Sequence, residues 1–249
     1  MGKNKLRKFA EMETLPCVFQ YPFSVLRSEG GCPMRGKWNS DYFRNGNPIV
    51  VELGCGKGEY AVGLAQTTPD RNFIGIDIKG ARMWTGACRV RDLGLTNCAF
   101  LRTGIELLDE FFAPGEVSEI WITFPDPQMK KVNKRLTGTR FLELYRKVLR
   151  PDGRLNLKTD SPFLYTYTRE MLRHNGLTPD ADTADLYASE LAASLPPIRT
   201  FYEQQWLDRG LTIKFLTWIL PPSPPLSEPE IEIEPDTYRS FGRGELQGF

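Results

Sequence analysis

The chain has 249 residues, of which 41% are hydrophobic, and its formal net charge is only +1. This length and apolar content fit one α/β domain with appendages better than two domains. Its five cysteines are scattered without a C-x-x-C pair and His174 is the only histidine, which excludes a zinc site or a disulfide framework. No signal peptide or membrane-spanning apolar run is present, so we expect a cytoplasmic protein without metal or membrane contacts.

The first 47 residues form a basic arm and a lead-in loop. They carry eight lysines and arginines against four acids. The segment GKNKLRKFAEMETLPCVFQYPF shows no clear hydrophobic period, which fits either a docking arm or a frayed end. Residues 32–48 are dominated by glycine, proline, tryptophan and asparagine, and this composition predicts a loop that leads to the core.

Strands and helices then alternate along the domain that we expect over residues 48–220. The predicted strands are 49–53, 72–78, 98–102, 118–124 and 154–159. The predicted helices are 59–67, 81–93, 104–112, 139–149 and 162–175. This alternation predicts an α/β fold with a mostly parallel, doubly wound, Rossmann-like sheet. Residues 211–220 are expected to add an antiparallel strand at one edge, and the proline-rich, acidic tail 221–249 is not expected to pack on its own.

A glycine loop follows the first of these strands. Gly54, Gly56 and Gly58 allow a sharp turn and a close approach of the backbone to a ligand, although a glycine loop alone is a weak signal. Glu52 precedes them, and a carboxylate there suits a positively charged ligand better than a pyrophosphate. Asp77 ends the next strand, where an acid can bind ribose hydroxyls; a helix N-cap is the less favoured alternative. Together these residues predict an S-adenosylmethionine site of a Rossmann-like methyltransferase.

Asp126 stands between two prolines in the sequence EIWITFPDPQMKK, directly after a predicted buried strand. Both prolines fix φ and remove backbone donors, so the aspartate is presented rigidly at the carboxyl end of the sheet. An isolated Pro-Asp-Pro would more often be a simple turn. Asp160 ends the neighbouring strand and is expected to face the same pocket, but it could instead cap the helix that starts after Ser161.

The stretch 130–158 is strongly basic. It contains ten lysines and arginines against only Glu143 and Asp152. A basic surface on a nearly neutral protein indicates a polyanionic partner, while the positions on the predicted helix fit a solvated face. The loop residues expected to bind phosphates are Lys130, Lys131, Lys134 and Arg135.

The motifs ELGCGKG, FPDP-x-x-KK, KTD and T-x-[FY]-E give the chain a resemblance to the bacterial single-chain tRNA (guanine-N7-)-methyltransferases, from the N-terminal arm to about residue 220. The resemblance implies class I S-adenosylmethionine-dependent chemistry, tRNA as the partner and no obligate protein partner. It implies cofactor binding by Glu52, the loop glycines, Asp77 and Asp126. Asp126 is also the implied catalytic acid. The implied substrate contacts are Lys130, Lys131, Asp160, Thr200, Tyr202 and Glu203.

The chain departs from this family pattern at three places. Gln128 and Met129 replace the usual Trp-Pro pair, and the basic loop is shorter by about two residues. The acid usual after the third strand is missing, because the sequence there is Arg102-Thr103-Gly104; Thr103 is expected to bind the adenine edge instead.

Guanine N7 carries a lone pair and no proton, so its methylation needs positioning and electrostatic stabilisation rather than a general base. The expected product is N7-methylguanosine at the variable-loop position conventionally numbered 46. Two alternatives remain at this stage. One is an amino-group methyltransferase acting on another nucleic acid or on a protein. The other is a non-catalytic RNA-binding protein on a methyltransferase fold.

Overall fold

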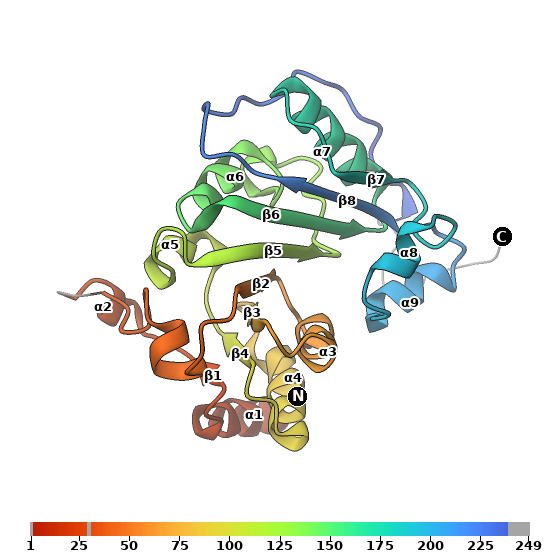
Figure 1. The fold of residues 1–249 in the computed structure, drawn as a ribbon. Coiled ribbons are helices and arrows are strands. Elements are labelled where there is room, and N and C mark those ends of the chain that lie inside the picture. The colour runs from red at the N-terminus through yellow and green to blue at the C-terminus, as the bar shows by residue number, and fades with distance from the viewer. Residues whose placement is uncertain (1, 29–30, 239–249) are drawn as a thin grey trace.

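The computed structural model describes residues 2–28 and 31–238, and these form one mixed sheet with helices on both faces (Figure 1). The strands in the described residues are β1 (Val18–Phe19), β2 (Ile49–Leu53), β3 (Asn72–Ile76), β4 (Cys98–Leu101), β5 (Val117–Thr123), β6 (Leu149–Thr159), β7 (Ala181–Thr183) and β8 (Lys214–Ile219). The α-helices are α1 (Gly2–Thr14), α2 (Phe23–Leu26), α3 (Glu59–Thr67), α4 (Gly80–Leu93), α5 (Leu108–Phe111), α6 (Thr139–Arg146), α7 (Pro162–His174), α8 (Leu191–Ser194) and α9 (Phe201–Leu207).

The strand order is β1-β4-β3-β2-β5-β6-β8-β7, and it confirms the predicted doubly wound fold. Strands β1 to β6 run parallel to one another, and β8 is antiparallel to both β6 and β7. The predicted antiparallel strand is therefore present, but it is not outermost, because the three-residue strand β7 pairs along its free side. Chain order reverses between β2 and β5, which is where ligands bind in open α/β sheets.

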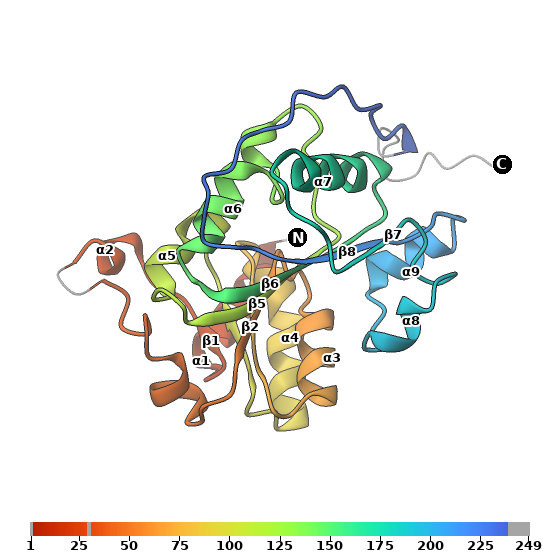
Figure 2. The ribbon, with the colours of Figure 1, turned by 45° about the horizontal axis from the view of Figure 1, so that its top comes forward.

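Two hydrophobic clusters lie on opposite faces of the sheet. Every residue of β2, β3 and β4 is buried, as expected for parallel strands covered on both sides. Helices α3 and α4 pack on one face, while α6 and α7 pack on the other (Figure 2). Helices α8 and α9 lie beyond the carboxyl ends of β5 and β6 (Figure 1).

The N-terminal arm is ordered and packed, so the frayed alternative is wrong. Helix α1 packs against α4, with Met12 buried and the indole N–H of Trp84 donating to Glu11 Oε2 at 2.7 Å. The arm then adds β1 to the edge of the sheet beside β4. Residues 38–43 of the expected loop form a short π-helical segment, and Trp38 is fully buried, with its indole N–H donating to the Phe111 carbonyl at 3.0 Å.

The remaining differences from the sequence prediction are the short helices α2, α8 and α9, which were not expected, and several shifted boundaries. Strand β6 begins at Leu149 rather than at residue 154, and α6 ends at Arg146. The tail runs from the end of β8 past α6 and α7 (Figure 1, Figure 2), and its Asp236 is only 5% exposed. The division into arm, domain and tail stays a prediction. Within the described residues, no helix has both the length and the apolar character needed to cross a membrane.

Candidate active site

The glycine loop lies after β2, at the reversal of strand order. Gly54, Gly56 and Gly58 have φ values of 72°, 56° and 68°, a region that glycine adopts without steric cost. A Cβ added to Gly54 would meet no atom within 4 Å, so this part of the backbone faces open space. The Gly56 N–H donates to Asp77 Oδ2 at 2.9 Å. The loop is therefore shaped for close approach of a ligand and is tied to the predicted ribose-binding acid.

A cavity of about 470 Å³ opens beside this loop, within the range of roughly 300–1,000 Å³ typical of small-molecule sites. Gly54, Asp77 and Thr103 line it from the carboxyl ends of three neighbouring strands. The Lys79 N–H donates to Asp77 Oδ1 at 2.7 Å, which fixes the carboxylate at the cavity wall. Gln128, from the Pro-Asp-Pro loop, also lines the cavity. The structure thus brings these predicted cofactor residues together.

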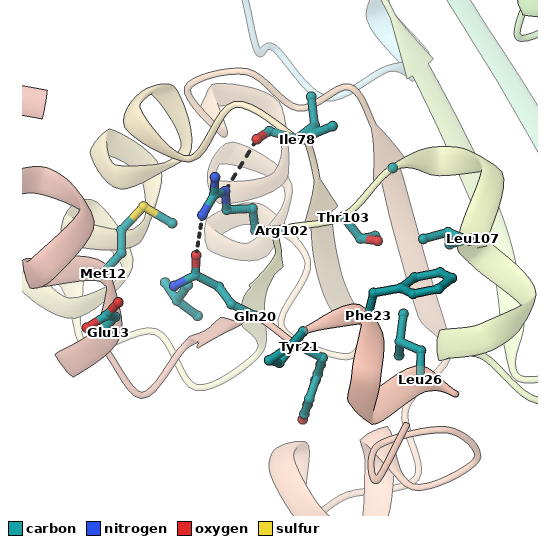
Figure 3. A pocket seen from close by; sticks show the side chains of 13 residues that line it. Met12, Glu13, Gln20, Tyr21, Phe23, Leu26, Ile78, Arg102, Thr103 and Leu107 are labelled. Carbon is teal, nitrogen blue, oxygen red and sulfur yellow. Dashed lines mark hydrogen bonds between the residues drawn. The ribbon is translucent and has the colours of Figure 1, made fainter. Parts of the chain in front are cut away.

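A second cavity, of about 630 Å³, lies on the arm side of Thr103 (Figure 3). Its walls include Tyr21 and Phe23 from the arm. The Arg102 guanidinium donates to the Ile78 carbonyl at 3.3 Å and to Gln20 Oε1 at 2.9 Å, as the dashed lines in Figure 3 mark. The arm is consequently part of the wall beside the cofactor cavity, which the sequence did not indicate.

Glu52 lies beneath the glycine loop and is only 3% exposed. Its carboxylate accepts hydrogen bonds from the Thr123 hydroxyl at 2.7 Å and from the Ala61 N–H, in α3, at 2.9 Å. Burial raises its pKa from 4.5 to about 7, against the lowering effect of these two hydrogen bonds. Glu52 does not line the cavity, so its carboxylate can interact with a cationic ligand there only through the glycine loop that covers it.

The Pro-Asp-Pro loop is held in an unusual backbone conformation. Phe124 and Gln128, on either side of it, have φ values of 49° and 48°, where side chains other than glycine are disfavoured. Asp126 is exposed, and its Oδ1 accepts a hydrogen bond from the Gln128 N–H at 3.0 Å. The carboxylate is therefore presented to solvent at the end of β5, beside the cofactor cavity.

Arg135 is buried, with 3% of its surface exposed, and it supports this loop from behind. Its guanidinium donates to the carbonyls of Pro127 at 3.2 Å and Gln128 at 3.1 Å. It also lies over the rings of Tyr167 and Phe163, at 3.9 and 4.8 Å from their centroids. The prediction that Arg135 binds phosphate is wrong, because its side chain is buried and its Nε and Nη2 groups donate to carbonyls of the loop.

The loop lysines and Asp160 lie in contrasting environments. Lys130 and Lys131 are exposed, and no ion pair within the described residues involves them. Asp160 is fully buried, and its Oδ2 accepts a hydrogen bond from the Tyr238 hydroxyl, in the tail, at 2.6 Å. The cap of α7 is Ser161 rather than Asp160, since its side chain accepts from the Leu164 N–H. The capping alternative for Asp160 is therefore wrong.

The segment Thr200 to Glu203 begins α9 as a capping box, in which Thr200 Oγ1 accepts the Glu203 N–H at 3.1 Å. Glu203 is fully buried and forms an ion pair with Lys158 Nζ at 2.7 Å. Burial lowers the pKa of Lys158, although Glu203 opposes this effect. A direct substrate contact from Glu203 does not fit this burial. Tyr202, by contrast, is 36% exposed.

Helix α9 also contacts the glycine loop. The Phe201 N–H donates to Glu59 Oε2 at 3.1 Å, and Lys57 Nζ lies 4.3 Å from the centre of the Phe201 ring. The T-x-[FY]-E element and the glycine loop are thus neighbours in space although they are far apart in sequence.

Comparison with known proteins adds the family. Residues 46–216 match the family model described as "Putative methyltransferase". The chain is 57% identical over its whole length to a tRNA (guanine-N(7)-)-methyltransferase of Bacteroides fragilis, covering 98% of that protein. It is 63% identical over 93% of its length to the enzyme of the same name from Porphyromonas gingivalis, covering 96% of that protein. The chain belongs to the tRNA (guanine-N(7)-)-methyltransferase family.

Among solved structures, the 16S rRNA methyltransferase KamB resembles this family member with a TM-score of 0.57. The two chains share 16% sequence identity, and the match covers 75% of this chain and 92% of KamB. At that identity the likeness concerns the fold alone, which is the class I methyltransferase fold.

Sequence reasoning missed the contacts that three residues make around the site. Arg135 supports the Pro-Asp-Pro loop, Lys158 anchors α9 and Tyr238 covers Asp160. A lysine inside an otherwise apolar strand was a usable signal for Lys158, because a buried lysine requires an acidic partner. The position of Tyr238 had no such signal, since it depends on the path of an irregular tail.

Proposed function

We propose that the protein transfers a methyl group from S-adenosylmethionine to N7 of a guanine in tRNA, at variable-loop position 46. The observation that carries this proposal is the exposed carboxylate of Asp126, fixed at the end of β5 beside the cofactor cavity, in a chain of this family. The cytoplasm, where tRNA is processed, is the proposed compartment.

The residues of the cavity fit the proposed cofactor. Asp77 offers a fixed carboxylate to ribose hydroxyls, and the open backbone at Gly54 admits a bulky ligand. Thr103, between the two cavities, provides a hydroxyl for the adenine edge. Glu52 adds negative charge below the loop. The bound cofactor would supply a methyl group activated by an adjacent sulfonium.

Asp126 would act on the guanine rather than as a base. The attacking N7 has no proton to lose, but the purine becomes cationic as the methyl group arrives and its N1–H becomes more acidic. A carboxylate that accepts from N1–H and the exocyclic amine binds this state better than the ground state, and it rejects adenine. The left-handed residues Phe124 and Gln128 and the Arg135 anchor keep Asp126 in place before the tRNA arrives.

The tRNA contacts divide into two kinds. Lys130, Lys131 and Lys134 are exposed and free to bind phosphates, which position the RNA without reading its sequence. Tyr202 is exposed at the start of α9 and can contact the substrate directly. Thr200 and Glu203 act through the capping box and the Lys158 ion pair, by holding α9 against the glycine loop.

The test is incubation of the protein with unmodified total tRNA and S-adenosylmethionine, followed by nucleoside analysis. We expect N7-methylguanosine, mapped to position 46. An N1- or N2-methylated guanosine, or a methylated adenosine, would overturn the reaction assignment. Cofactor binding with no tRNA product would instead support the non-catalytic RNA-binding alternative.

A further inference from the structure

The tail segment, residues 226–238, lies on the surface that the proposed tRNA contacts occupy. At one end, Glu228 Oε1 accepts the Thr139 N–H at 2.8 Å and the Thr139 hydroxyl at 2.7 Å, at the start of α6. Its other oxygen accepts the Tyr167 hydroxyl. Because the first N–H groups of a helix form a natural site for phosphate, this carboxylate occupies a position that suits an RNA backbone.

The other end of the tail segment covers Asp160, one of the predicted substrate contacts. Asp236 accepts the Phe163 N–H at 3.0 Å and the Ser161 hydroxyl, so it occupies the start of α7 as Glu228 occupies the start of α6. Tyr238 then donates to Asp160 Oδ2, and its ring lies 5.4 Å from that of Trp206. An aromatic ring with a polar edge thus contacts a carboxylate that the family resemblance gives as a substrate contact.

Between these two anchors the tail segment exposes its acids, while Ile233 packs against the hydrophobic core. Glu230, Glu232 and Glu234 are exposed, and a cavity of about 730 Å³ separates this middle part from the side chains of Met129, Val132 and Arg135. In extended chain, acids at every second residue from 228 to 236 lie about 6.6 Å apart. This regular row of negative charge beside the exposed lysine loop repels an approaching RNA backbone.

We propose that the tail segment is a built-in competitor of tRNA for one surface, formed by the lysine loop 130–134, the starts of α6 and α7, and Asp160. The tail segment imitates the substrate, with carboxylates in place of phosphates and the Tyr238 ring in place of the base. tRNA binds after the two anchored ends are released. The inference rests on the proposed function for the identity of the competing ligand.

The experiment compares tRNA binding and cofactor binding for four proteins, using a fluorescent unmodified tRNA transcript. Besides the full chain, these are a deletion of residues 226–249, the anchor variant Glu228→Gln/Asp236→Asn, and the matched control Glu230→Gln/Glu232→Gln. The control removes the same number of negative charges from the tail segment but leaves the anchoring contacts of Glu228 and Asp236 intact. We expect the deletion to bind tRNA at least about tenfold more tightly and the anchor variant to show most of this gain. The control should gain less than about threefold, and all four should bind the cofactor equally.

Equal or weaker tRNA binding by the deletion, with an unchanged melting temperature, would overturn the proposal and make the tail segment a permanent part of the tRNA site. If the deletion variant melts more than about 5 °C below the full chain, the tRNA affinity of the anchor variant tests the proposal instead, because that variant keeps the whole chain. Equal gains in the anchor and control variants would show simple charge repulsion and also overturn the competition. Nucleoside analysis of the same proteins separates this proposal from the proposed function. Tighter tRNA binding without formation of N7-methylguanosine would refute the proposed reaction but still support competition between the tail segment and tRNA.

Discussion

Substitution of Glu52 by glutamine should change how the stability of the protein depends on pH. Glu52 is almost fully buried and accepts hydrogen bonds from Thr123 and Ala61. Its pKa is raised from 4.5 to about 7 because burial disfavours the charged carboxylate. Glutamine has nearly the same shape and can still accept the Ala61 N–H, but it never becomes charged.

The size of the effect follows from linkage. A carboxyl group with a raised pKa stabilises the folded state fully below pH 4.5, and this contribution is lost as pH rises to about 7. The shift corresponds to about 3 kcal/mol of unfolding free energy. The unfolding free energy of Glu52→Gln, relative to that of the wild-type protein, should therefore rise by about this amount between pH 5 and 8. Taking the difference cancels the titrations that both proteins share.

Urea denaturation at pH 5, 6, 7 and 8 measures this difference, and Asp70→Asn, at an exposed position, serves as the matched control. The titration should also appear in cofactor binding. A cationic ligand favours the ionised carboxylate, so wild-type affinity should strengthen as pH rises through about 7 relative to that of the variant. Stability curves of wild type and variant that stay parallel over this range would refute the reasoning.

Three further predictions concern the loop, its lysines and the buried ion pair. Asp126→Asn should change the unfolding free energy by no more than about 0.5 kcal/mol but slow single-turnover methyl transfer by roughly a hundredfold. A variant with a lowered melting temperature would show that the loop is a structural turn. Recovery of the rate at saturating cofactor would assign Asp126 to cofactor binding. Replacing Lys130 and Lys131 by glutamine should flatten the salt dependence of tRNA binding by about one unit of slope per lost phosphate contact, without changing cofactor affinity. An unchanged slope would mean that the two lysines are only solvated surface. Lys158→Met should lower the unfolding free energy in urea by about 3–5 kcal/mol, because it leaves a buried carboxylate unpaired; a loss below about 1 kcal/mol would contradict that account.

The core of the fold could be predicted because its signals are local. Strands such as 49–53 are nearly continuous apolar runs, and they alternate with helical segments along the sequence. The structure of the arm could not be predicted, because a two-residue strand such as Val18–Phe19 has no hydrophobic period and forms only by pairing with the sheet edge that β4 supplies. The other strand that the sequence did not predict, β7, has only three residues and depends on β8 in the same way.

For the candidate site, the sequence identified which residues end the strands but not which of them are exposed. Asp126 and Glu203 look equally polar in the sequence, yet one is exposed and the other is fully buried. Arg135 could not be separated from its lysine neighbours, because its role comes from two aromatic rings on α7 that pack against it. Burial of a charged side chain is decided by partners distant in sequence, and no local pattern carries that information.

The pairing of β1 with β4 has a consequence for the order in which the protein can fold during synthesis. The carbonyls of Cys17 and Phe19 accept hydrogen bonds from the N–H groups of Phe100 and Arg102, at 2.7 and 2.9 Å. At roughly 5–20 residues per second, a ribosome needs about 4–16 seconds to extend the chain from the first partner to the second. During that interval the apolar side of α1, including Met12, has no α4 to cover it. A nascent chain therefore carries an exposed, basic, amphipathic segment until α4 emerges, and its β1 has no partner strand until β4 follows. Fusions that restrain the N-terminus should lower the yield of folded protein.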